Sequence, residues 1–261
     1  MKIITPEISE QVICQIRRIG GMLTNPLAVK SVDFKKPTDF VTNVDYTVQS
    51  QVRAALACLT PDIQFMGEEG PKEELDLTKP MWILDPVDGT TNLIHNYMHS
   101  AISLGLLEDG QITFAVVYDP YTSECFTARR GHGAFCNGRP VKVSEREDIS
   151  SSLVTVGTAP AWREFADETF GDMRKIYDKC QDVRRSGCAS LDLCSVASGR
   201  TEGFLELYLL PWDYAAGTLI LEEAGGRVTT PEGGPVRFDK GCGILATNGL
   251  IHEQLMDIIK D

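Results

Sequence analysis

Long hydrophobic runs, paired cysteine motifs and an excess of basic residues are all missing from this sequence. No stretch approaches the roughly 20 apolar residues that a membrane-spanning helix needs, so we expect no membrane partner. Residues 1–6 lack the apolar centre of a secretion signal, which favours a cytoplasmic location.

The eight cysteines are scattered, and no two of them form a C-x-x-C pair. This spacing argues against a zinc site. In a chain of 261 residues, scattered cysteines are typical of reduced residues in the core. The role of any individual cysteine stays open.

The charge balance is acidic, with 37 Asp and Glu against 25 Lys and Arg and a net charge of −12. Such a surface repels nucleic acid, so we expect no nucleic-acid partner. It also repels a phosphate substrate, and divalent metal ions are one way to supply local positive charge. Solubility explains most of the acidic residues, while a few of them are candidates to hold metal.

The first part of the chain predicts two helices and a mostly antiparallel sheet. Apolar residues recur at helical spacing over residues 8–19 and 44–56. Asp109-Gly110 separates two apolar runs within residues 101–118, which is typical of a β-hairpin. Short apolar runs, such as the one at residues 81–84, predict buried strands.

Past about residue 150 the pattern alternates between strands and helices, which predicts a sheet flanked by helices. We predict an N-terminal α+β subdomain (1–147) with the antiparallel sheet and most of the candidate ligands. A C-terminal α/β subdomain (148–261) would contribute Glu206 and Asp213. Nothing between them resembles a flexible linker, so the halves should pack tightly.

The segment W-I-L-D-P-V-D-G-T-T-N carries the strongest chemical signal. A predicted strand delivers Asp85 at its end, and Asp88 follows on a tight turn. These carboxylates and the Val87 carbonyl between them are hard oxygen ligands that suit Mg²⁺. The amides of Gly89 and Thr90, at a helix start, suit a phosphate. After a buried strand, the whole string favours a site over an ordinary Asp-Gly turn.

Three further acidic residues stand at the edges of predicted elements. Glu68 follows the glycine that ends a strand, Asp213 stands where a helix begins, and Glu206 lies on the strand before it. Their ordinary alternatives are a solvated turn, a helix cap and an exposed strand residue. Beside the central segment, Glu68 and Asp213 become candidate metal ligands, and Glu206 becomes a candidate contact to substrate hydroxyls.

A fourth string, D-F-V-T-N-V-D, places Asp45 at the start of the second predicted helix. An acidic residue also simply suits a first helical turn. Lys35 and Lys36 precede it in a polar loop or short hairpin, where solvated lysines are the ordinary alternative.

Together these strings resemble the inositol monophosphatase family, whose motifs they match in order over essentially the full chain. R-S-G-C-A-S-L and W-D-Y-A-A-G match as well, and the pair D-P-x-D-G-T-T-N and W-D-x-A-A-G is highly specific. The resemblance implies an α/β fold layered αβαβα, dependence on two or three Mg²⁺ ions, lithium sensitivity and a homodimer.

The resemblance also implies roles for individual residues. The metal sites would be built from Glu68, Asp85, the Val87 carbonyl, Asp88 and Asp213. Thr90 with Asp45 resembles the pair that orients the attacking water, and Glu68 joins them in catalysis. The substrate would meet Asp88, Gly89, Thr90, Thr91, Ala189, Glu206 and Asp213, with a loop contact from Lys35 or Lys36.

The sequence departs from the family pattern in small ways. Gly70 stands where serine is frequent, and Met98 and His99 stand where a proline is common. These changes leave the implied metal site intact and bear on substrate choice instead.

The function that follows is Mg²⁺-dependent hydrolysis of a phosphomonoester by in-line attack of a metal-activated water. The substrate would be a small phosphorylated sugar or cyclitol, with inositol-1-monophosphatase as the first candidate activity. Fructose-1,6-bisphosphatase and histidinol-phosphatase are alternatives. The former needs basic residues for a second phosphate, for which Arg129, Arg130 and Arg185 are candidates.

Two further alternatives are a phosphatase with another mechanism and a protein without catalytic activity. Phosphatases that form an aspartyl-phosphate typically carry D-x-D-G-T near the N-terminus, whereas this chain has a central D-x-x-D-G-T. A non-catalytic metal- or phosphate-binding regulatory protein is the other alternative. The apparently complete ligand set disfavours it, because clustered carboxylates repel one another without metal.

Overall fold

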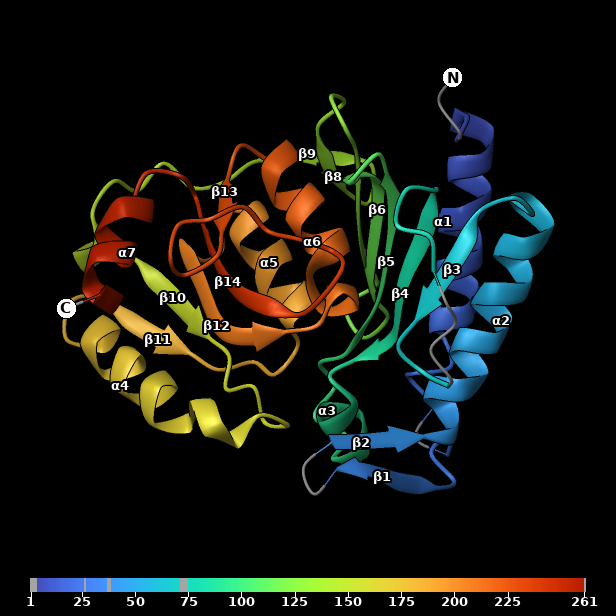
Figure 1. Ribbon diagram of the computed structural model, residues 1–261, viewed down its shortest axis with the longest axis horizontal. Helices are drawn as coiled ribbons and strands as arrows, with labels where there is room; N and C mark the ends of the chain where they lie inside the picture. Colours follow the sequence, from blue (N-terminus) through green and yellow to red (C-terminus); the bar gives the residue numbers. More distant parts are fainter. Residues whose placement is uncertain (1–3, 26, 37–38, 71–74, 261) are drawn as a thin grey trace.

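The computed structural model describes residues 4–25, 27–36, 39–70 and 75–260, and within residues 34–39 it describes at most the backbone. The described chain stacks three layers of helices and two main sheets in the order αβαβα (Figure 1). The fold class predicted from the sequence is confirmed.

The larger sheet is built from the first half of the chain. All its neighbouring pairs are antiparallel except the first, β3 with β4, which is parallel. In spatial order its strands are β3 (Gln64–Gly67), β4 (Met81–Asp88), β5 (Ala101–Glu108), β6 (Gln111–Asp119), β7 (Glu124–Arg129), β8 (Ala134–Cys136) and β9 (Arg139–Val141).

One face of this sheet is covered by α1 (Pro6–Gly20) and α2 (Asn43–Leu59). Thr5 caps α1, since its hydroxyl accepts the Ile8 amide at 3.3 Å. The apolar stripes predicted from the periodicity are buried against the sheet, where they form one hydrophobic core with the outer face of β4–β6.

The other face packs on α5 (Ala189–Ala197) and α6 (Pro211–Glu223), both from the second half of the chain. These helices are apolar almost all round because a sheet lies on each side of them. One hydrophobic core therefore joins the two halves, as the absence of a flexible linker suggested.

The smaller sheet lies beyond α5 and α6, and α4 (Ala166–Tyr177) and α7 (His252–Lys260) cover its outer face (Figure 1). Its strands, in spatial order, are β11 (Asp182–Arg184), β10 (Leu153–Val156), β12 (Gly203–Leu209), β14 (Cys242–Thr247) and β13 (Arg227–Thr229). The two main sheets draw their strands from either side of the predicted division at residues 147 and 148, which itself stays a prediction.

Five smaller elements complete the described chain. β1 (Val32–Lys36) and β2 (Asp39–Thr42) form the predicted short hairpin, and α3 (Thr90–Ile94) is the helix that follows the central motif. Two 3₁₀ turns, Ile149–Ser151 and Arg163–Phe165, precede β10 and α4.

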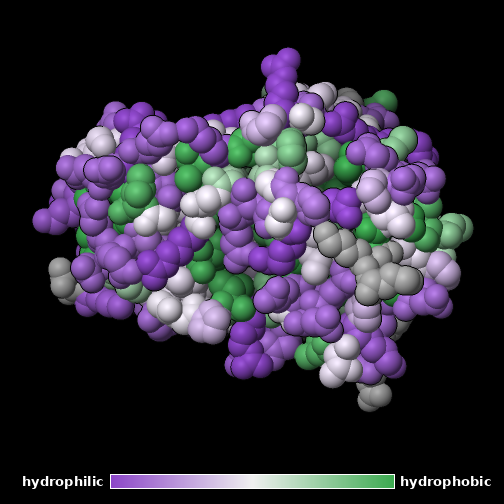
Figure 2. Space-filling model, turned by 90° about the horizontal axis from the view of Figure 1, so that it is seen from above, coloured by the Kyte–Doolittle hydropathy of each residue, from purple (hydrophilic) through white to green (hydrophobic). Residues whose placement is uncertain are grey.

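The face seen in Figure 2 is covered largely by hydrophilic residues, with hydrophobic residues scattered between them. None of the helices in the described ranges is both long and apolar enough to cross a bilayer.

Candidate active site

A bulge in β4 brings its two aspartates to one face of the sheet. Asp85 pairs with Ser103 and Asp88 pairs with Ala101, so three steps along β4 match two steps along β5. Residues three apart on a regular strand point to opposite faces, whereas one extra residue restores the same face. The Ser103 hydroxyl bonds the Trp212 carbonyl of α6 at 3.2 Å, which identifies this face as the one toward α5 and α6.

Glu68 reaches the same region from the neighbouring strand. Its amide donates to the Leu84 carbonyl at 3.1 Å and so extends the parallel ladder of β3 and β4. Gln49 of α2 clamps the next residue, because its side chain donates to the Glu69 carbonyl at 2.6 Å and accepts the Glu69 amide at 3.0 Å. Gly67 permits this approach, since a Cβ there would lie 2.2 Å from the Gln49 amide oxygen.

Asp88 is held by the start of α5. Its Oδ2 accepts the Ser190 amide at 2.7 Å, the Ser190 hydroxyl at 2.6 Å and the Cys188 thiol at 3.1 Å. Burial raises the pKa of Asp88, and the bonds from Ser190 and Cys188 oppose that rise, as does the amide of Ala189, a predicted substrate contact that lies between them. The carboxylate of Asp88, from the first half of the chain, is thus held by hydrogen-bond donors from the second half.

Asp213 and Glu206 come from the second half, as predicted. Asp213 is the third residue of α6, and its Oδ2 accepts the Leu210 amide at 2.7 Å, which is the capping role weighed for it. Glu206 of β12 is buried, and its Oε1 accepts the Ala159 amide at 2.7 Å. A Cβ at Gly157 would lie 1.9 Å from the other Glu206 oxygen, so a glycine there is what makes room for this carboxyl.

Asp45 and Thr90 form a second polar group beside the bulge. Asp45 is fully buried and accepts the amide and hydroxyl of Thr42, at 2.9 and 2.5 Å, in a capping box. The Thr90 hydroxyl lies 3.1 Å from Asp45 Oδ1 and 3.0 Å from the Val87 carbonyl. Burial raises the pKa of Asp45, against the lowering effect of the bonds from Thr42 and Thr90.

The turn into α3 needs its glycine. Gly89 has a φ of 89°, and a Cβ there would lie 3.0 Å from the His99 carbonyl. Asn92 of the same motif donates to the His99 and Ser186 carbonyls at 2.8 and 3.0 Å, which ties α3 to the loop before α5. Thr91, predicted to contact substrate, is exposed on the first turn of α3.

The acidic side chains act strongly on one another. Burial raises the pKa of Asp85 well above its ordinary value, and the neighbouring carboxyls of Glu68, Asp88 and Asp213 raise it further. Burial and then Asp88 and Glu68 likewise raise the pKa of Asp213. The carboxyl of Glu68, which directly follows β3, and those of β4 and α6 are therefore close enough to repel one another, although more than 140 residues separate Glu68 from Asp213.

Glu206 and Asp192 extend this acidic region. Burial is the main reason that the pKa of Glu206 rises to about 7 and that of Asp192 to about 8. Arg185 opposes both shifts. The predicted loop contacts, Lys35 and Lys36, have side chains outside the described part of the structure.

The donor set fits Mg²⁺ by its chemistry. Carboxylate oxygens and a backbone carbonyl are the ligands that this ion prefers, and a divalent cation would relieve the repulsion that raises these pKa values. As the side chains stand, no group of three His, Cys, Asp or Glu in the described ranges is arranged as a finished metal cluster. Instead, one carboxylate oxygen accepts a hydrogen bond from a backbone amide in each of Asp85, Asp88 and Asp213.

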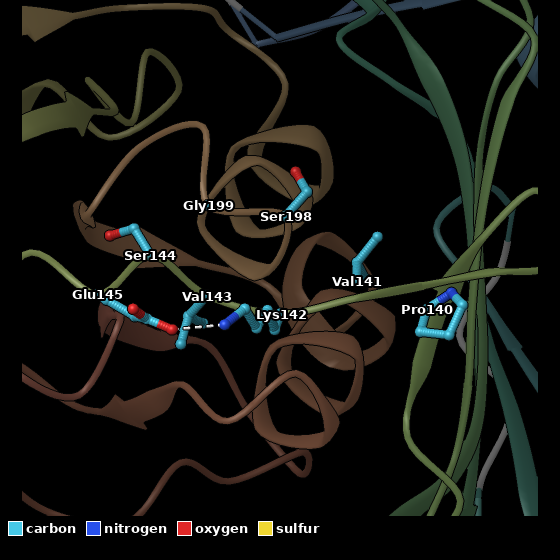
Figure 3. Close-up of a pocket in the computed structure, with 8 residues that line it drawn as sticks. All are labelled: Pro140, Val141, Lys142, Val143, Ser144, Glu145, Ser198 and Gly199. Carbon is cyan, nitrogen blue, oxygen red and sulfur yellow. Dashed lines mark hydrogen bonds and ion pairs between the residues drawn. The ribbon is translucent and has the colours of Figure 1, made fainter.

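Two cavities in the described part of the chain have linings that do not include the acidic cluster, which consists of Glu68, Asp85, Asp88 and Asp213. One, of about 520 Å³, is an open surface hollow beside residues 140–145, Ser198 and Gly199, where Lys142 pairs with Glu145 (Figure 3). The other, of about 430 Å³, borders Gly67, Glu69 and Trp212, the neighbours of two predicted ligands. The second is therefore the one adjacent to the chemistry.

Sequence reasoning missed the residues that hold the predicted ones. The sequence patterns do not identify Gln49, Cys188 and Ser190 as site residues, although Cys188 and Ser190 belong to the motif R-S-G-C-A-S-L. A polar residue such as Ser190 within an apolar helix is a signal that could have identified it. The partner of each became visible only in three dimensions.

Comparisons with known proteins indicate one family. The model of the inositol monophosphatase family matches residues 10–261. An inositol-1-monophosphatase of Rhizobium meliloti is 39% identical over 88% of this chain and 86% of its own. A Nus factor SuhB of Escherichia coli is 38% identical over 84% of this chain and 83% of its own.

Solved structures are similar over nearly the whole chain. The extragenic suppressor protein suhB from Bartonella henselae superposes with a TM-score of 0.91 at 33% identity, covering 98% of this chain and 99% of that one. The inositol monophosphate bound SaIMPase-II has a TM-score of 0.80 at 26% identity, covering 96% and 91%. A lithium-soaked inhibitory complex of Staphylococcal inositol monophosphatase-1 has a TM-score of 0.87 at 25% identity, covering 97% and 94%.

Proposed function

Because the chain belongs to the inositol monophosphatase family, we propose that it is a Mg²⁺-dependent phosphatase acting on a small phosphorylated sugar or cyclitol, with inositol 1-phosphate as the first candidate substrate. The observation that supports the proposal is that Glu68, Asp85, Asp88 and Asp213 lie close enough for their charges to raise the pKa values of Asp85 and Asp213. The Rhizobium relative named inositol-1-monophosphatase and the inositol monophosphate complex support the substrate class.

Mg²⁺ would be held by the four carboxylates and the Val87 carbonyl. When bound, it supplies positive charge that offsets the charge of the phosphate and makes water a stronger nucleophile near neutral pH. The amides of Gly89 and Thr90 would hold the phosphate at the start of α3.

Thr90 and Asp45 would orient the attacking water. The Thr90 hydroxyl has one proton, and donating it to Asp45 Oδ1 leaves an oxygen lone pair that can accept a proton from water. Asp45 is itself fixed by two bonds from Thr42, so this pair keeps one geometry. The water would attack the phosphorus in line with the leaving oxygen, and the departing alkoxide would take a proton from solvent water.

Glu206 would recognise the substrate's hydroxyl groups. Its Oε1 is occupied by the Ala159 amide, which leaves the second oxygen for a ring hydroxyl. Because its pKa is about 7, the fraction of charged carboxylate changes within the neutral range. Substrate affinity would accordingly rise as the pH increases through 7.

The remaining properties follow the family. We propose a homodimer in the cytoplasm and inhibition by Li⁺, as in the Staphylococcal lithium complex. Fructose-1,6-bisphosphatase and histidinol-phosphatase activities stay as alternatives within the same chemistry.

Phosphate release from a panel of substrates tests the proposal. Inositol 1-phosphate, fructose 1,6-bisphosphate and histidinol phosphate should be compared with Mg²⁺, with EDTA, and with Mg²⁺ plus Li⁺. We expect release that requires Mg²⁺, is inhibited by Li⁺ and is fastest with inositol 1-phosphate. No release from any substrate would contradict the proposal and favour the non-catalytic metal- or phosphate-binding alternative.

A further inference from the structure

The support of Asp88 comes from groups that are completely enclosed. Ser190 has no exposed surface, Cys188 is 1% exposed and Asp88 is 8% exposed. Three donors converge on one oxygen of this carboxylate, at 2.6, 2.7 and 3.1 Å. In surroundings without water such bonds are stronger than at the surface, and they restrict the carboxylate to one orientation.

Helix capping explains only part of this arrangement. The residue before α5, Cys188, makes no cap bond with its own side chain, and Asp88 takes that place by accepting the Ser190 amide. A cap needs only this backbone donor. The Ser190 hydroxyl and the Cys188 thiol add two donors that the helix does not require, and both point at the same oxygen.

We infer that Ser190, assisted by Cys188, is a positioning residue that fixes the Asp88 carboxylate for the cation required by the proposed function. The inference rests on that function, because it concerns how one of its ligands is held. Groups that orient a metal ligand typically change metal affinity by about 10–100-fold when they are removed. Removing the Ser190 hydroxyl should reduce Mg²⁺ affinity by a factor in this range. Removing the Cys188 thiol, whose contact with Asp88 is longer, should reduce the affinity by less.

Calorimetric titration of the full-length protein with Mg²⁺ tests the inference. Ser190→Ala should weaken Mg²⁺ binding by about 10–100-fold and raise the Mg²⁺ concentration needed for half-maximal phosphate release. Cys188→Ala should weaken binding less, and Cys188→Ser, which keeps a donor, should bind nearly as the wild type. The matched control is Ser195→Ala, which removes another α5 hydroxyl that bonds only the Leu191 carbonyl of its own helix.

Each outcome separates this inference from the proposed function. Equal Mg²⁺ affinity in Ser190→Ala and Ser195→Ala would overturn the positioning role alone. A wild-type protein that binds no Mg²⁺ would overturn the proposed function and the inference with it. Should Ser190→Ala fail to fold, the comparison of Cys188→Ala with Cys188→Ser decides, since equal affinities there would also contradict the inference.

Discussion

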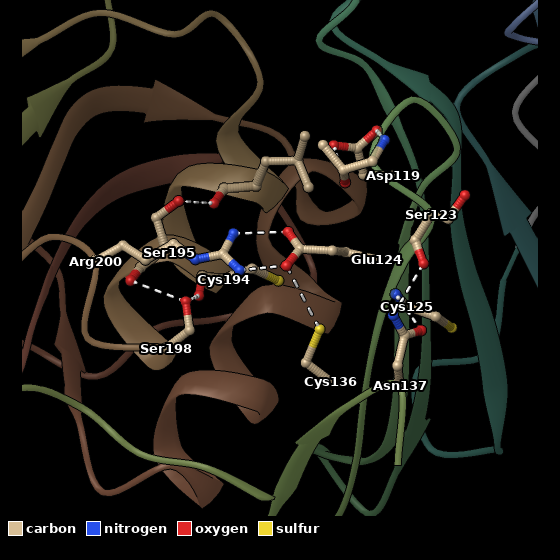
Figure 4. A network of polar contacts seen from close by, with 12 residues as sticks. Asp119, Ser123, Glu124, Cys125, Cys136, Asn137, Cys194, Ser195, Ser198 and Arg200 are labelled. Atoms are coloured by element: carbon tan, nitrogen blue, oxygen red, sulfur yellow. Dashed lines mark hydrogen bonds and ion pairs between the residues drawn. The ribbon is translucent and has the colours of Figure 1, made fainter. Parts of the chain in front are cut away.

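Glu124 and the acidic cluster, which consists of Glu68, Asp85, Asp88 and Asp213, both lie between the larger sheet and the second half of the chain, and their pKa values shift in opposite directions. Glu124 of β7 bonds both terminal nitrogens of the Arg200 guanidinium, one of them at 2.7 Å, and the pKa of Glu124 is lowered (Figure 4). In the acidic cluster, burial and neighbouring carboxyls raise the pKa of Asp85 and Asp213 instead.

The opposite pKa shifts distinguish a structural contact, that of Glu124 with Arg200, from a candidate binding site, the acidic cluster. Arg200 also lies over the Phe126 ring at 5.6 Å, and the Cys136 thiol lies 3.9 Å from Glu124, so this contact is complete within the chain. The acidic cluster gathers like charges at a cost to folding, which is typical of functional sites. The proposed cation would stabilise the acidic cluster, as Arg200 stabilises Glu124.

The largest effect is expected from Asp88→Asn. The amide keeps the size of the side chain but removes the charge needed by the proposed cation site. Turnover should fall by more than about a hundredfold, beyond the range typical of groups that only support a metal ligand. Phosphate release and circular dichroism would measure this; near-normal turnover in a folded variant would refute the role of Asp88.

Next in size is the pH dependence of the cation-free protein. The pKa of Asp192 rises from 3.8 to about 8, so the folded state holds a proton that the unfolded state has lost. The stability that this group contributes is therefore present below pH 4 and is lost as the pH rises through 8, at about 1.4 kcal/mol per pH unit. Urea unfolding in the presence of EDTA, repeated over this pH range, measures the decline. We expect the unfolding free energy of Asp192→Asn to fall less steeply with pH than that of the wild type.

Asp182 offers a matched control for that measurement. Its carboxyl pairs with Arg184, and its pKa is lowered. Asp182→Asn should leave the decline between pH 5 and 8 as it is in the wild type. If the unfolding free energy fell equally steeply with pH in Asp192→Asn and in the wild type, Asp192 would not be the cause of the decline.

A smaller effect should follow from adding Mg²⁺. A ligand at a hundred times its dissociation constant stabilises the folded state by about 2.7 kcal/mol, which corresponds to a rise of about 5–10 °C in Tm for a chain of this size. Thermal unfolding in Mg²⁺ and in EDTA measures the shift. Asp85→Asn should reduce it, and an unchanged shift in that variant would place the bound ion elsewhere.

The smallest effect is expected from Arg200→Met. The guanidinium is about half exposed, so losing its pair with Glu124 should cost only about 0.5–1 kcal/mol of unfolding free energy. Turnover and Mg²⁺ affinity should be unchanged within about twofold. A loss of turnover as large as that of Asp88→Asn would show that the contact of Glu124 with Arg200 is not purely structural.

Local patterns predicted much of the fold. The helical stripe of α2 and the hairpin of β5 and β6 follow from side-chain periodicity and from the turn residues Asp109 and Gly110, which have φ values of 50° and 76°. In the second half, the sequence pattern predicts one helix over residues 162–178, but the α-helix begins four residues later than this pattern indicates. The rings of Trp162 and Phe165 instead pack on Tyr208, 4.5 and 5.7 Å between centroids, and α4 begins only at Ala166.

The candidate site shows the same limit. Motifs singled out Asp85, Asp88 and Asp213 because each stands at the end of a strand or the start of a helix. The bulge that aligns the first two depends on pairing with β5, and no local pattern encodes that register. The bond between Asp88 and Ser190 spans 102 positions of the chain, so only tertiary structure reveals it.

That span also bears on how the protein is made. A ribosome delivers Asp88 long before it delivers Ser190, and Asp213 emerges later still. A nascent chain that ends before α5 therefore contains the central motif without the donors that hold it. The proposed activity can begin only when nearly all of the polypeptide has been synthesised, so incomplete translation products should be inert toward phosphate esters.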